Sequence, residues 1–563
     1  MCGFIGRILS DRDRAVSPLS NALLFLHRRG PDSNATWRSV DGGVELLHAR
    51  LAIVDLDGRA TQPLVDTLHG LVLVFNGEIY NYVELRQELA AYPFRTGSDS
   101  EVILAAYALR GLVGLNLLKG MFSLALVDTR KRRVVLARDA VGKKPLFLSR
   151  INGVVAFGSS VLALAAVSGA GAEVNPEAVE HFWRESFVRP DQSAVRGVNP
   201  VLPGQVLELD EDGKVVATSW LTPTPALRYE GETVAEAERN VGRLLELAVS
   251  RRLRDNPSPA VLCSGGIDST VVAMAAVRLE EQGGLRRPLQ LLTLGSAVPL
   301  TNDEFFARYA ARRLRRQVRV VRPRMDGMGQ SVREMFALQD EPLGMISFLL
   351  LSRLVAAVTG HSHILLTGDG GDEVFLGYGE VAEWNGQPAV ANMPDASHVP
   401  CGPLLPTWMS AWGVSAATDH LVGHGFTKVD RASAEQGVEV RSPLLDWDLM
   451  AYARSLPFAH LAVGGRTKAL LKRQFVGWPS WFLERPKQGF TFNLRYAWGV
   501  RNYDGLRELV SGDAIAQFDR WLPPELRRSA SDWSALAVFR NFSAVWKLAA
   551  WSQFLARSRV VSR

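Results

Sequence analysis

The sequence predicts an α+β domain followed by an α/β domain built on a parallel sheet. Short β-rich runs separated by turn residues occupy roughly residues 1–160, with two helical stretches among them. From about residue 233 the pattern is mainly helical, interrupted by a few short apolar runs typical of buried strands. Strands that alternate with helices favour a parallel sheet, which binds ligands at the carboxyl ends of its strands.

Composition excludes several classes of protein. The 563 residues leave room for about three or four domains. Hydrophobic residues make up 47% and charged residues 22%, the balance of an ordinary globular protein. The three cysteines, Cys2, Cys263 and Cys401, form neither a disulfide framework nor a metal-site spacing. We therefore expect a reducing, cytoplasmic setting.

Charge and hydropathy argue against nucleic-acid and membrane partners. The net charge is only +6, with no concentrated basic face in the sequence. No apolar run approaches the ~18 residues that a membrane helix needs. The N-terminus lacks a basic segment followed by an apolar one, so no secretory signal is predicted.

The first 165 residues are expected to form one domain. Apolar runs predict strands that end at turn residues: Val72–Phe75, closed by Asn76-Gly77, then Met121–Val127 and Val134–Ala137. Residues 84–89 and 100–109 are expected to be helical. A connecting region is expected over residues 166–232, because it holds Asn175-Pro176, Asn199-Pro200 and Pro203-Gly204, with Thr222-Pro223-Thr224-Pro225 as the best linker candidate.

Residues 233–563 are expected to form the second domain. Val234–Leu253 carries apolar residues at helical spacing, and Ser269–Leu279 returns to that pattern. Pro259–Cys263 and His363–Leu366 are short apolar runs that predict buried strands, and each ends in a glycine-rich turn.

Cys2 follows the initiator methionine and precedes Gly3. Removal of Met1 would leave a thiol and an α-amine on one residue. The amine has a pKa near 8, so it can accept a proton, and the thiol then needs no separate histidine. The alternative is that position two merely tolerates a small residue.

Polar residues in the first domain can bind both ends of a free amino acid. Asn76 and the Gly77 amide can stabilise an oxyanion, and Glu78 can pair with an ammonium group. Arg50 can clamp a carboxylate with two hydrogen bonds, and Asp99 offers a second acid at a helix start. The alternative is that Asn76-Gly77 is a hairpin turn and Asp99 a helix cap.

These segments resemble the glutaminase domain of class II glutamine amidotransferases, the N-terminal-nucleophile type with a layered α+β fold. The matching stretches are Met1–Gly3, His27–Asp32, Arg50–Val54, Asn76–Asn81, Ser98-Asp99 and Arg138–Leu146. The resemblance implies that Cys2 attacks the glutamine side-chain amide and releases ammonia. It implies an oxyanion hole made by Asn76 and Gly77. It also implies that glutamine is held by Arg50, Leu51, Ile53, Val54, Glu78 and Asp99.

Two glycine turns in the second domain can face one nucleotide. Ser264-Gly265-Gly266-Ile267-Asp268-Ser269 follows a predicted strand and precedes a helix, so its backbone amides can approach phosphates. Leu366–Glu373 is a second such turn, and Asp268 and Asp372 can share Mg²⁺ at a pyrophosphate. Asp340-Glu341-Pro342 adds acids near a third element. Lys468 and Lys487 can offset phosphate charge, although a lone lysine is more often solvated.

The second half resembles the pyrophosphatase-loop synthetase domain of asparagine synthetase. The matches are Ser264–Ser269, Asp340–Pro342, Thr367–Glu373 with Phe375 and Gly377-Tyr378, Asp430-Arg431, Val438–Arg441, Pro443–Asp446, Lys468 and Arg485–Phe490. The resemblance implies an ATP site that comprises Cys263, Ser264, Gly265, Gly266, Asp268, Ser269, Leu294, Thr367, Gly368 and Lys468. Of these, Cys263, Leu294, Thr367 and Gly368 would line the adenine and ribose pocket.

The resemblance implies a glutamine-hydrolysing, AMP-forming amide ligase. ATP activates a carboxylate as an acyl-adenylate, and ammonia from Cys2 displaces AMP through a shielded passage. Aspartate is the default acceptor, with Asp369 as the base for incoming ammonia and with ATP and Mg²⁺ as cofactors. The resemblance also leaves a homodimer as an option.

Departures from the family pattern motivate a second acceptor hypothesis. Asp369 stands where the asparagine-forming enzymes usually carry Glu, Thr367 replaces a usual Ser, and Ser442 replaces an apolar residue. Met345-Ile346-Ser347 is also unusual for a site that seats aspartate. The alternative acceptor is therefore a carboxylate of natural-product or surface-polysaccharide biosynthesis. A less favoured alternative is an inactive homologue with a binding role.

Overall fold

The computed structural model describes most of the chain. The described residues are 2–9, 17–53, 55, 58–168, 173–254, 258–295, 303–322, 328–336, 339–377, 418–434, 436–462, 466–485 and 503–560. Six residues named above, Met1, Val54, Tyr378, Cys401, Lys487 and Phe490, lie outside these ranges.

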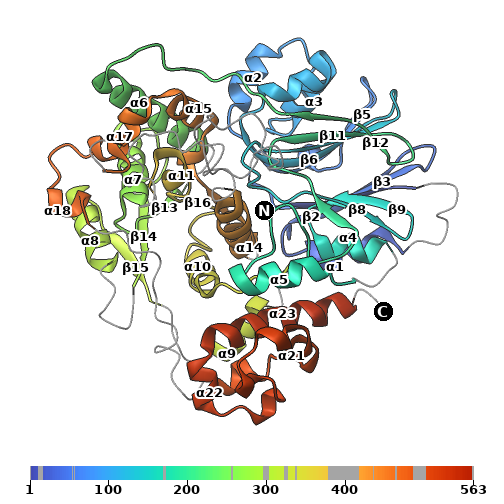
Figure 1. Cartoon of the computed structure of the whole chain (residues 1–563). Coiled ribbons are helices and arrows are strands. Elements are labelled where there is room, and N and C mark those ends of the chain that lie inside the picture. The colour runs from blue at the N-terminus through green and yellow to red at the C-terminus, as the bar shows by residue number, and fades with distance from the viewer. Residues whose placement is uncertain are drawn as a thin grey trace, which may run out of the picture.

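Two six-stranded sheets form the centre of the first domain (Figure 1). The first sheet has the order β10 (Val198–Pro200), β8 (Phe147–Ile151), β9 (Val154–Gly158), β1 (Gly3–Ile8), β3 (Val44–Arg50) and β2 (Ser33–Arg38). The second has the order β12 (Val215–Trp220), β11 (Gln205–Leu209), β7 (Arg133–Arg138), β6 (Gly120–Asp128), β5 (Leu71–Ile79) and β4 (Leu64–Asp66). Neighbouring strands are antiparallel throughout both sheets.

Apolar side chains hold the layers of this domain together. Phe4 and Leu46 of the first sheet share a buried cluster with Val74 and Leu136 of the second, so the two sheets face each other. The outer face of the second sheet packs on α2 (Tyr82–Glu88) and α3 (Glu101–Arg110), and that of the first on α1 (Leu23–Leu26), α4 (Val161–Val167) and α5 (Pro176–Glu185). The predicted layered α+β fold is confirmed.

Strand β5 is longer than the sequence predicts. We expected a strand that ends at Phe75, but β5 runs through Asn76-Gly77 to Ile79 and stays paired with β6. Gly77 explains the difference, because a Cβ atom there would lie 2.0 Å from the carbonyl oxygen of Met121. Without a side chain the strand can pass this oxygen. The hairpin-turn alternative for Asn76-Gly77 is therefore wrong.

The expected connecting region contributes to the sheets of the first domain. β10 pairs with β8, and β11 pairs with both β7 and β12. Asn175-Pro176, expected to be a turn, starts α5: the Asn175 side chain caps the helix and Pro176 occupies its first turn. The boundary expected at residue 165 lies inside α4, and hydrogen-bonded structure of this domain continues to Trp220.

A five-stranded parallel sheet forms the centre of the second domain, as predicted. Its order is β15 (Val318–Val321), β14 (Gln290–Leu294), β13 (Ala260–Leu262), β16 (Ile364–Leu366) and β17 (Glu439–Arg441). One buried cluster joins it to α6 (Val234–Leu253), α7 (Ile267–Glu281), α8 (Asp303–Arg313), α11 (Gly371–Phe375), α15 (Trp447–Ser455), α16 (Phe458–Leu461), α17 (Ala469–Arg473) and α18 (Ser480–Leu483). A second joins it to α10 (Ile346–Ala356) and α14 (Thr427–Ala434), which follows a π-helical segment, Thr418–Phe426.

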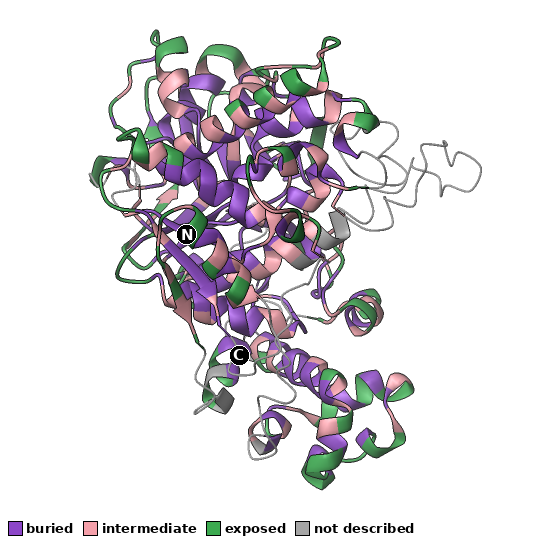
Figure 2. Ribbon diagram, turned by 90° about the vertical axis from the view of Figure 1, so that its left-hand side faces the viewer, coloured by how far each residue is buried: buried purple, intermediate pink, exposed green. Residues whose placement is uncertain are grey.

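A helical unit follows at the end of the chain, drawn in red at the bottom of Figure 1. It contains α20 (Tyr503–Arg507), α21 (Gly512–Phe518), α22 (Ala535–Arg540) and α23 (Phe542–Val560), together with α9 (Met328–Phe336). Fully buried Trp533, Trp546 and Trp551 belong to its core, and one buried cluster joins this core to that of the first domain. Figure 2 colours the buried residues purple along the ribbon. Among the described residues no helix is both long enough and apolar enough to cross a membrane.

Candidate active sites

Cys2 lies immediately before β1, against the chain that leaves β3. Its thiol donates to the carbonyl oxygen of Leu51 at 3.6 Å and accepts from the Leu51 amide at 3.4 Å. The Nε of Arg29 donates to the Cys2 carbonyl oxygen at 3.2 Å. Burial raises the pKa of the Cys2 thiol, while the amino terminus acts in the opposite direction. Burial therefore opposes loss of the thiol proton, and a base that accepts this proton is needed before Cys2 can act as a nucleophile.

Asn76 is fully buried on β5, and both polar atoms of its side-chain amide lack a hydrogen-bond partner among the described residues. A buried amide without a hydrogen-bond partner raises the free energy of the folded protein. Binding of a ligand that supplies the missing partner is therefore favoured. The carbonyl oxygen of Phe75, one residue earlier, lies 3.1 Å from the Nε2 atom of His48 on β3. This contact ties Asn76 to the strand that leads to Arg50 and Leu51.

The loop after β3 is joined to the start of α3. Arg50 donates to the carbonyl oxygen of Asp55 at 2.5 Å, and Asp55 accepts from the Gly97 amide at 2.6 Å. The carboxylate of Asp99 accepts from the Ile79 amide at 2.9 Å, at the end of β5. Burial raises the pKa of Asp99 above its ordinary value, and Glu439 adds to that effect. The predicted carboxylate and ammonium partners of glutamine are thus brought to one end of the sheets.

Glu78, expected to bind an ammonium group, contacts the second domain. Its Oε2 atom lies 3.0 Å from Nη2 of Arg441 on β17, and Arg441 also bonds Glu439 at 2.6 Å. Glu439 acts electrostatically on both Cys2 and Asp99, so the start of β17 lies near these two side chains. Sequence reasoning placed Glu439 and Arg441 only within a matching stretch and gave them no role, because the residues of the first domain that they act on lie more than 300 positions away.

The first glycine turn forms a cradle between β13 and α7. The hydroxyl of Ser269 accepts from the Ser264 amide at 3.1 Å and lies 2.9 Å from the Ser264 hydroxyl. Gly265 has a positive φ of +75°, and a Cβ atom there would lie 2.4 Å from the backbone of Phe306. Gly266 is the N-cap of α7, whose first amides face the turn. Such a turn at a helix N-terminus binds anions, phosphates in particular.

The second glycine turn touches the first. A Cβ atom on Gly368 would lie 2.6 Å from the Ser269 amide, and one on Gly371 would lie 2.3 Å from the Asp268 carboxyl group. The turn follows β16, which neighbours β13 in the sheet. Cys263 and Leu294, at the ends of β13 and β14, reach the same edge. The residues predicted for the nucleotide therefore converge at the carboxyl ends of the strands.

Lys468 bridges the two turns. Its ammonium group contacts the Asp268 carboxylate and lies 2.7 Å from Asp372. Lys468 is buried, so the solvated-lysine alternative is wrong, and the two carboxylates raise its pKa. Asp268 and Asp372 already share one cation, and carboxylate oxygens suit Mg²⁺. Among the described residues no group of three or more metal-ligating side chains is present, so phosphates or water would have to complete a magnesium shell.

Asp340 and Glu341 lie at the domain interface. The Asp340 carboxylate accepts from the Ser160 hydroxyl at 2.7 Å and from the amides of Val161 and Leu162 at 2.6 and 3.1 Å. Ser160 is the N-cap of α4, and Asp340 adds hydrogen bonds to the first amides of this helix from the second domain. Glu341 accepts from the Ala194 amide at 2.9 Å. These acids, expected near the nucleotide, instead join the domains.

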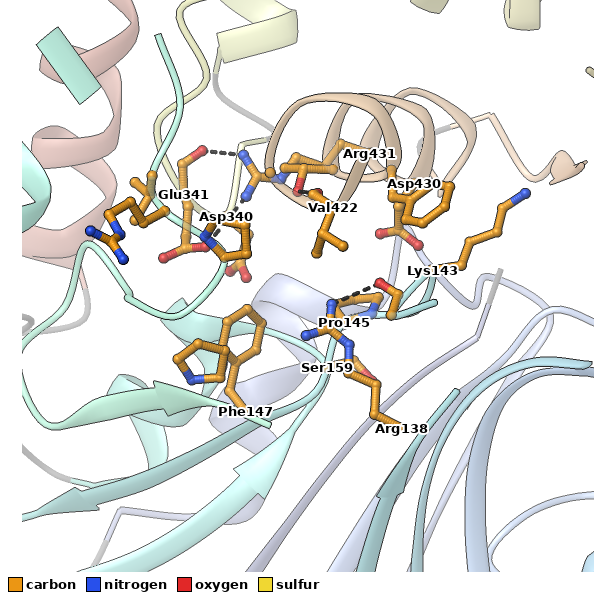
Figure 3. A pocket seen from close by; sticks show the side chains of 18 of the residues that line it. Arg138, Lys143, Pro145, Phe147, Ser159, Asp340, Glu341, Val422, Asp430 and Arg431 are labelled. Carbon is orange, nitrogen blue, oxygen red and sulfur yellow. Dashed lines mark hydrogen bonds and ion pairs between the residues drawn. The ribbon is translucent and has the colours of Figure 1, made fainter. Parts of the chain in front are cut away.

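A small pocket of about 70 Å³ lies at this interface (Figure 3). Residues of both domains line it, and several of them are charged: Arg29, Arg138, Lys143, Asp340, Glu341, Asp430 and Arg431. Arg29 binds Asp430 through two hydrogen bonds of 2.8 and 3.1 Å. The pocket adjoins Cys2 through Arg29 and has room for water-sized molecules.

Asp369, the predicted base, belongs to the second glycine turn and has polar neighbours. Its Oδ2 atom accepts from the Thr367 hydroxyl at 2.6 Å and from the Ser442 hydroxyl at 3.4 Å. The first domain reaches the same place, because Lys143 donates to the Ser442 hydroxyl at 2.6 Å. Sequence reasoning placed Lys143 only within a matching stretch and gave it no role.

A glutaminase-type domain joined to an α/β nucleotide-binding domain defines the class of glutamine-dependent amide ligases. Family models match both halves of the chain: a glutamine amidotransferase domain over residues 1–220 and asparagine synthase over residues 240–416 and 406–556. The chain belongs to the asparagine synthase family, and it is a ligase that uses glutamine and ATP.

Several named relatives match along most of the chain. A putative glutamine-hydrolysing asparagine synthetase of Mycobacterium tuberculosis is 27% identical over 580 residues, covering 88% of both chains. The asparagine synthetase of Gallus gallus is 29% identical over 521 residues, covering 87% of this chain and 84% of its own. Among solved structures, glutamine PRPP amidotransferase from B. subtilis is similar at 16% identity, with a TM-score of 0.30 over 57% of this chain and 81% of its own.

Proposed function

We propose that this chain converts a small carboxylate into an amide at two linked sites, with Cys2 as the glutaminase nucleophile. The observation that carries the proposal is the fully buried Asn76 amide, which has no partner among the described residues. An acyl-transfer site needs such a donor for its oxyanion. The family assignment of both domains supports the second site.

The first reaction takes place at Cys2. The α-amine, exposed on Cys2 once Met1 is removed, accepts the thiol proton, and Sγ attacks the side-chain carbonyl carbon of glutamine. The carbonyl electron pair moves to oxygen, where Asn76 and the Gly77 amide stabilise it. When the C–N bond breaks, the amine returns the proton and ammonia leaves. Water then hydrolyses the thioester to glutamate. Arg50 and Asp99 hold the carboxylate and the ammonium group of the substrate, and Leu51, Ile53 and Val54 belong to the same pocket.

The second reaction takes place at the two glycine turns. The acceptor carboxylate attacks the α-phosphate of ATP, and pyrophosphate leaves. Ser264, Gly265, Gly266 and Ser269 would cradle the phosphates, while Cys263, Leu294, Thr367 and Gly368 would border the nucleoside. Lys468 would neutralise the pyrophosphate. Asp268 and Asp372 would hold Mg²⁺, which supplies charge neutralisation when bound.

The amide forms when ammonia attacks the acyl carbon of the adenylate. The C–N bond forms, AMP leaves with the electron pair of the C–O bond, and one proton is lost from nitrogen. Asp369 is the proposed acceptor of that proton. Aspartate is the default acceptor carboxylate. The polar set of Asp369, Thr367 and Ser442 favours a second candidate, a carboxylate other than aspartate, because the asparagine-forming enzymes that the chain resembles carry different residues there.

A mass-spectrometric assay tests the proposal. Purified protein is incubated with glutamine, ATP, Mg²⁺ and aspartate, and glutamate, AMP and asparagine are followed together. Equal rates of all three establish aspartate as the acceptor and remove the second candidate. Glutamate without AMP leads to the same assay on other carboxylates. Glutamine-dependent product that persists in Cys2→Ala would contradict the assignment of the nucleophile.

A further inference from the structure

Lys143 is a buried cation that reaches from the glutaminase domain into the synthetase domain. Its side chain lies in the turn between β7 and β8, and only 6% of the residue is exposed. Its ammonium group donates to the Ser442 hydroxyl at 2.6 Å, and the Phe426 ring centroid lies 5.8 Å away. Ser442 directly follows β17 and is also buried. The contact therefore crosses the domain interface inside the protein.

The contact continues to Asp369. Ser442 donates to Oδ2 of Asp369 at 3.4 Å, and the same oxygen accepts from the Thr367 hydroxyl at 2.6 Å. The two hydroxyls lie 3.2 Å apart. A cation, two hydroxyls and a carboxylate thus form one connected polar group in a buried place. Such a group fixes the orientation of its members more strongly than one contact would.

The turn that carries Lys143 is held in one conformation. The Asp139 carboxylate accepts from the backbone amides of Lys143 and Lys144, each at 3.0 Å. The Arg138 guanidinium donates to the carbonyl oxygens of Gly142 and Lys144 at 2.8 and 2.7 Å. Gly142 has a positive φ of +68°. Two buried charges therefore hold the turn that directs Lys143 across the interface.

Burying an ammonium group is costly, and several charges act on this one. The pKa of Lys143 is lowered to about 7, and desolvation is the largest cause. Lys144 and Arg252 act in the same direction, while Asp369 and Asp139 act against it. Lys428 also interacts electrostatically with Asp369, and burial lowers the pKa of Lys428 as well. An apolar side chain would fill the same place without this cost, so the charge calls for a functional reason.

We propose that Lys143 is a positioning residue for amide formation, which orients the Asp369 carboxylate through Ser442. In that step the nitrogen of ammonia bonds the acyl carbon, AMP leaves with the C–O electron pair, and Asp369 accepts one proton from nitrogen. Ammonia and water compete for the acyl carbon of the adenylate, and a carboxylate held in a fixed orientation favours ammonia because it accepts the nitrogen proton readily. The inference rests on the proposed function, and it makes the nitrogen-transfer step depend on a residue of the other domain.

The test measures how the acyl-adenylate is divided between ammonia and water. Ammonium chloride replaces glutamine, and the amide formed per pyrophosphate released is followed with aspartate, or with the carboxylate that supports ATP–pyrophosphate exchange. Lys143→Met is expected to lower this ratio at least about tenfold and to leave exchange within about twofold. Ser442→Ala should act in the same direction. Lys131→Met, an exposed lysine of the same domain, is the matched control.

A pH profile separates positioning from packing. At constant free ammonia, the wild-type ratio should fall as pH rises through 7, because Lys143 loses its proton, and Lys143→Met should show no such change. An unchanged ratio in Lys143→Met, or a loss of exchange equal to the loss of amide, would overturn the inference.

Thermal unfolding tests the buried cation without any substrate. The pKa of Lys143 is about 7 in the folded state and near 10.4 in the unfolded state. The unfolded chain therefore binds more protons between these values, and stability rises with pH there. Lys143→Met should lose that rise, and an identical slope in both proteins would overturn the inference. Absence of exchange with every carboxylate, with the slope difference present, would instead count against the proposed function.

Discussion

Asn76 tests the glutaminase site at the scale of a single residue. Removing one oxyanion donor lowers the rate of acyl transfer by about 10²–10³-fold. We expect Asn76→Ala to lower glutaminase kcat by that factor with little change in KM, because the donor acts on the charge that develops in the transition state. Glutamate release by the purified protein measures it. The buried amide has no partner among the described residues, so its removal should not destabilise the domain.

ATP–pyrophosphate exchange in the same preparation is the internal control, because it reports the other domain. Equal losses of exchange and glutaminase in Asn76→Ala would indicate misfolding. Glutaminase that stays within threefold of the wild type would remove Asn76 from the oxyanion site.

The raised pKa of Asp99 predicts how glutamine binding weakens at low pH. Burial raises its pKa above the ordinary value of about 3.9, and Glu439 adds to the rise while Arg441 opposes it. The carboxylate must be charged to hold the ammonium group of glutamine. As pH falls, KM for glutamine should therefore begin to rise at a higher pH than an ordinary aspartate would allow. Asp99→Asn should have a high KM that changes little over the same range.

The residues predicted from sequence are those whose signal is local. Cys2, Asn76 and the two glycine turns belong to short motifs, because one loop must carry several groups of a site. Arg441 contacts Glu78, and Lys143 contacts Ser442, which lies 299 positions away in the sequence. Only the fold brings these residues together. No spacing rule connects such residues. Asp340 was noticed as an acid, but its partner helix could not be read from the sequence.

At the scale of elements, the start of α4 is bound by a carboxylate of the other domain in addition to its own N-cap, Ser160. Asp340 accepts three hydrogen bonds at the start of this helix, two of them from backbone amides. Loss of a helix cap costs about 0.5–2 kcal/mol. Asp340→Ala should lower the free energy of unfolding by that amount. It should also lower glutaminase activity, because α4 packs on the sheet that contains β1, the strand that directly follows Cys2. Chemical denaturation and glutamate release measure the two effects.

Ser534→Ala is a matched control for this cap. Ser534 accepts from the Ala537 amide at the start of α22, far from Cys2 along the chain and within the helical unit. It should cost a similar free energy and leave glutaminase unchanged. If Asp340→Ala left both stability and glutaminase unchanged, the cap would have no role in joining the domains.

Long periodic helices and buried apolar strands were predicted well, and an exposed strand without apolar alternation was not. The helix expected over Val234–Leu253 forms with those limits, because apolar spacing and the Thr233–Glu236 capping box agree. β12 has five of its six residues exposed, so it shows no apolar alternation, and only its pairing with β11 makes it a strand. The turn residues around it therefore indicated a connecting region.

At the scale of the whole molecule, buried ion pairs join the two domains. Glu78 meets Arg441, Arg29 meets Asp430, and Lys119 of the first domain meets Asp448 of the second at 2.7 Å. Arg251 on α6 also binds Asp448, at 3.1 Å. Charges buried in this way fix one arrangement of the partners, because any other leaves a charge unpaired. Two sites that share ammonia need such an arrangement.

Replacing Asp448 tests whether buried ion pairs hold the two domains in one relative arrangement. It is 1% exposed and accepts from Lys119, Arg251 and the Ala226 amide of the segment between the domains. Asp448→Ala removes the carboxylate that Lys119 and Arg251 share, and Arg251 keeps its contact with Glu84 at 3.3 Å. Breaking a buried pair in this way costs about 3–5 kcal/mol. We expect a single thermal transition in the wild type and two separated transitions in the variant, with less amide formed per glutamine hydrolysed.

Asp513→Ala, which breaks the exposed pair with Arg559, should change stability by no more than about 0.5 kcal/mol. One unshifted transition in Asp448→Ala would mean that this pair does not hold the domains together.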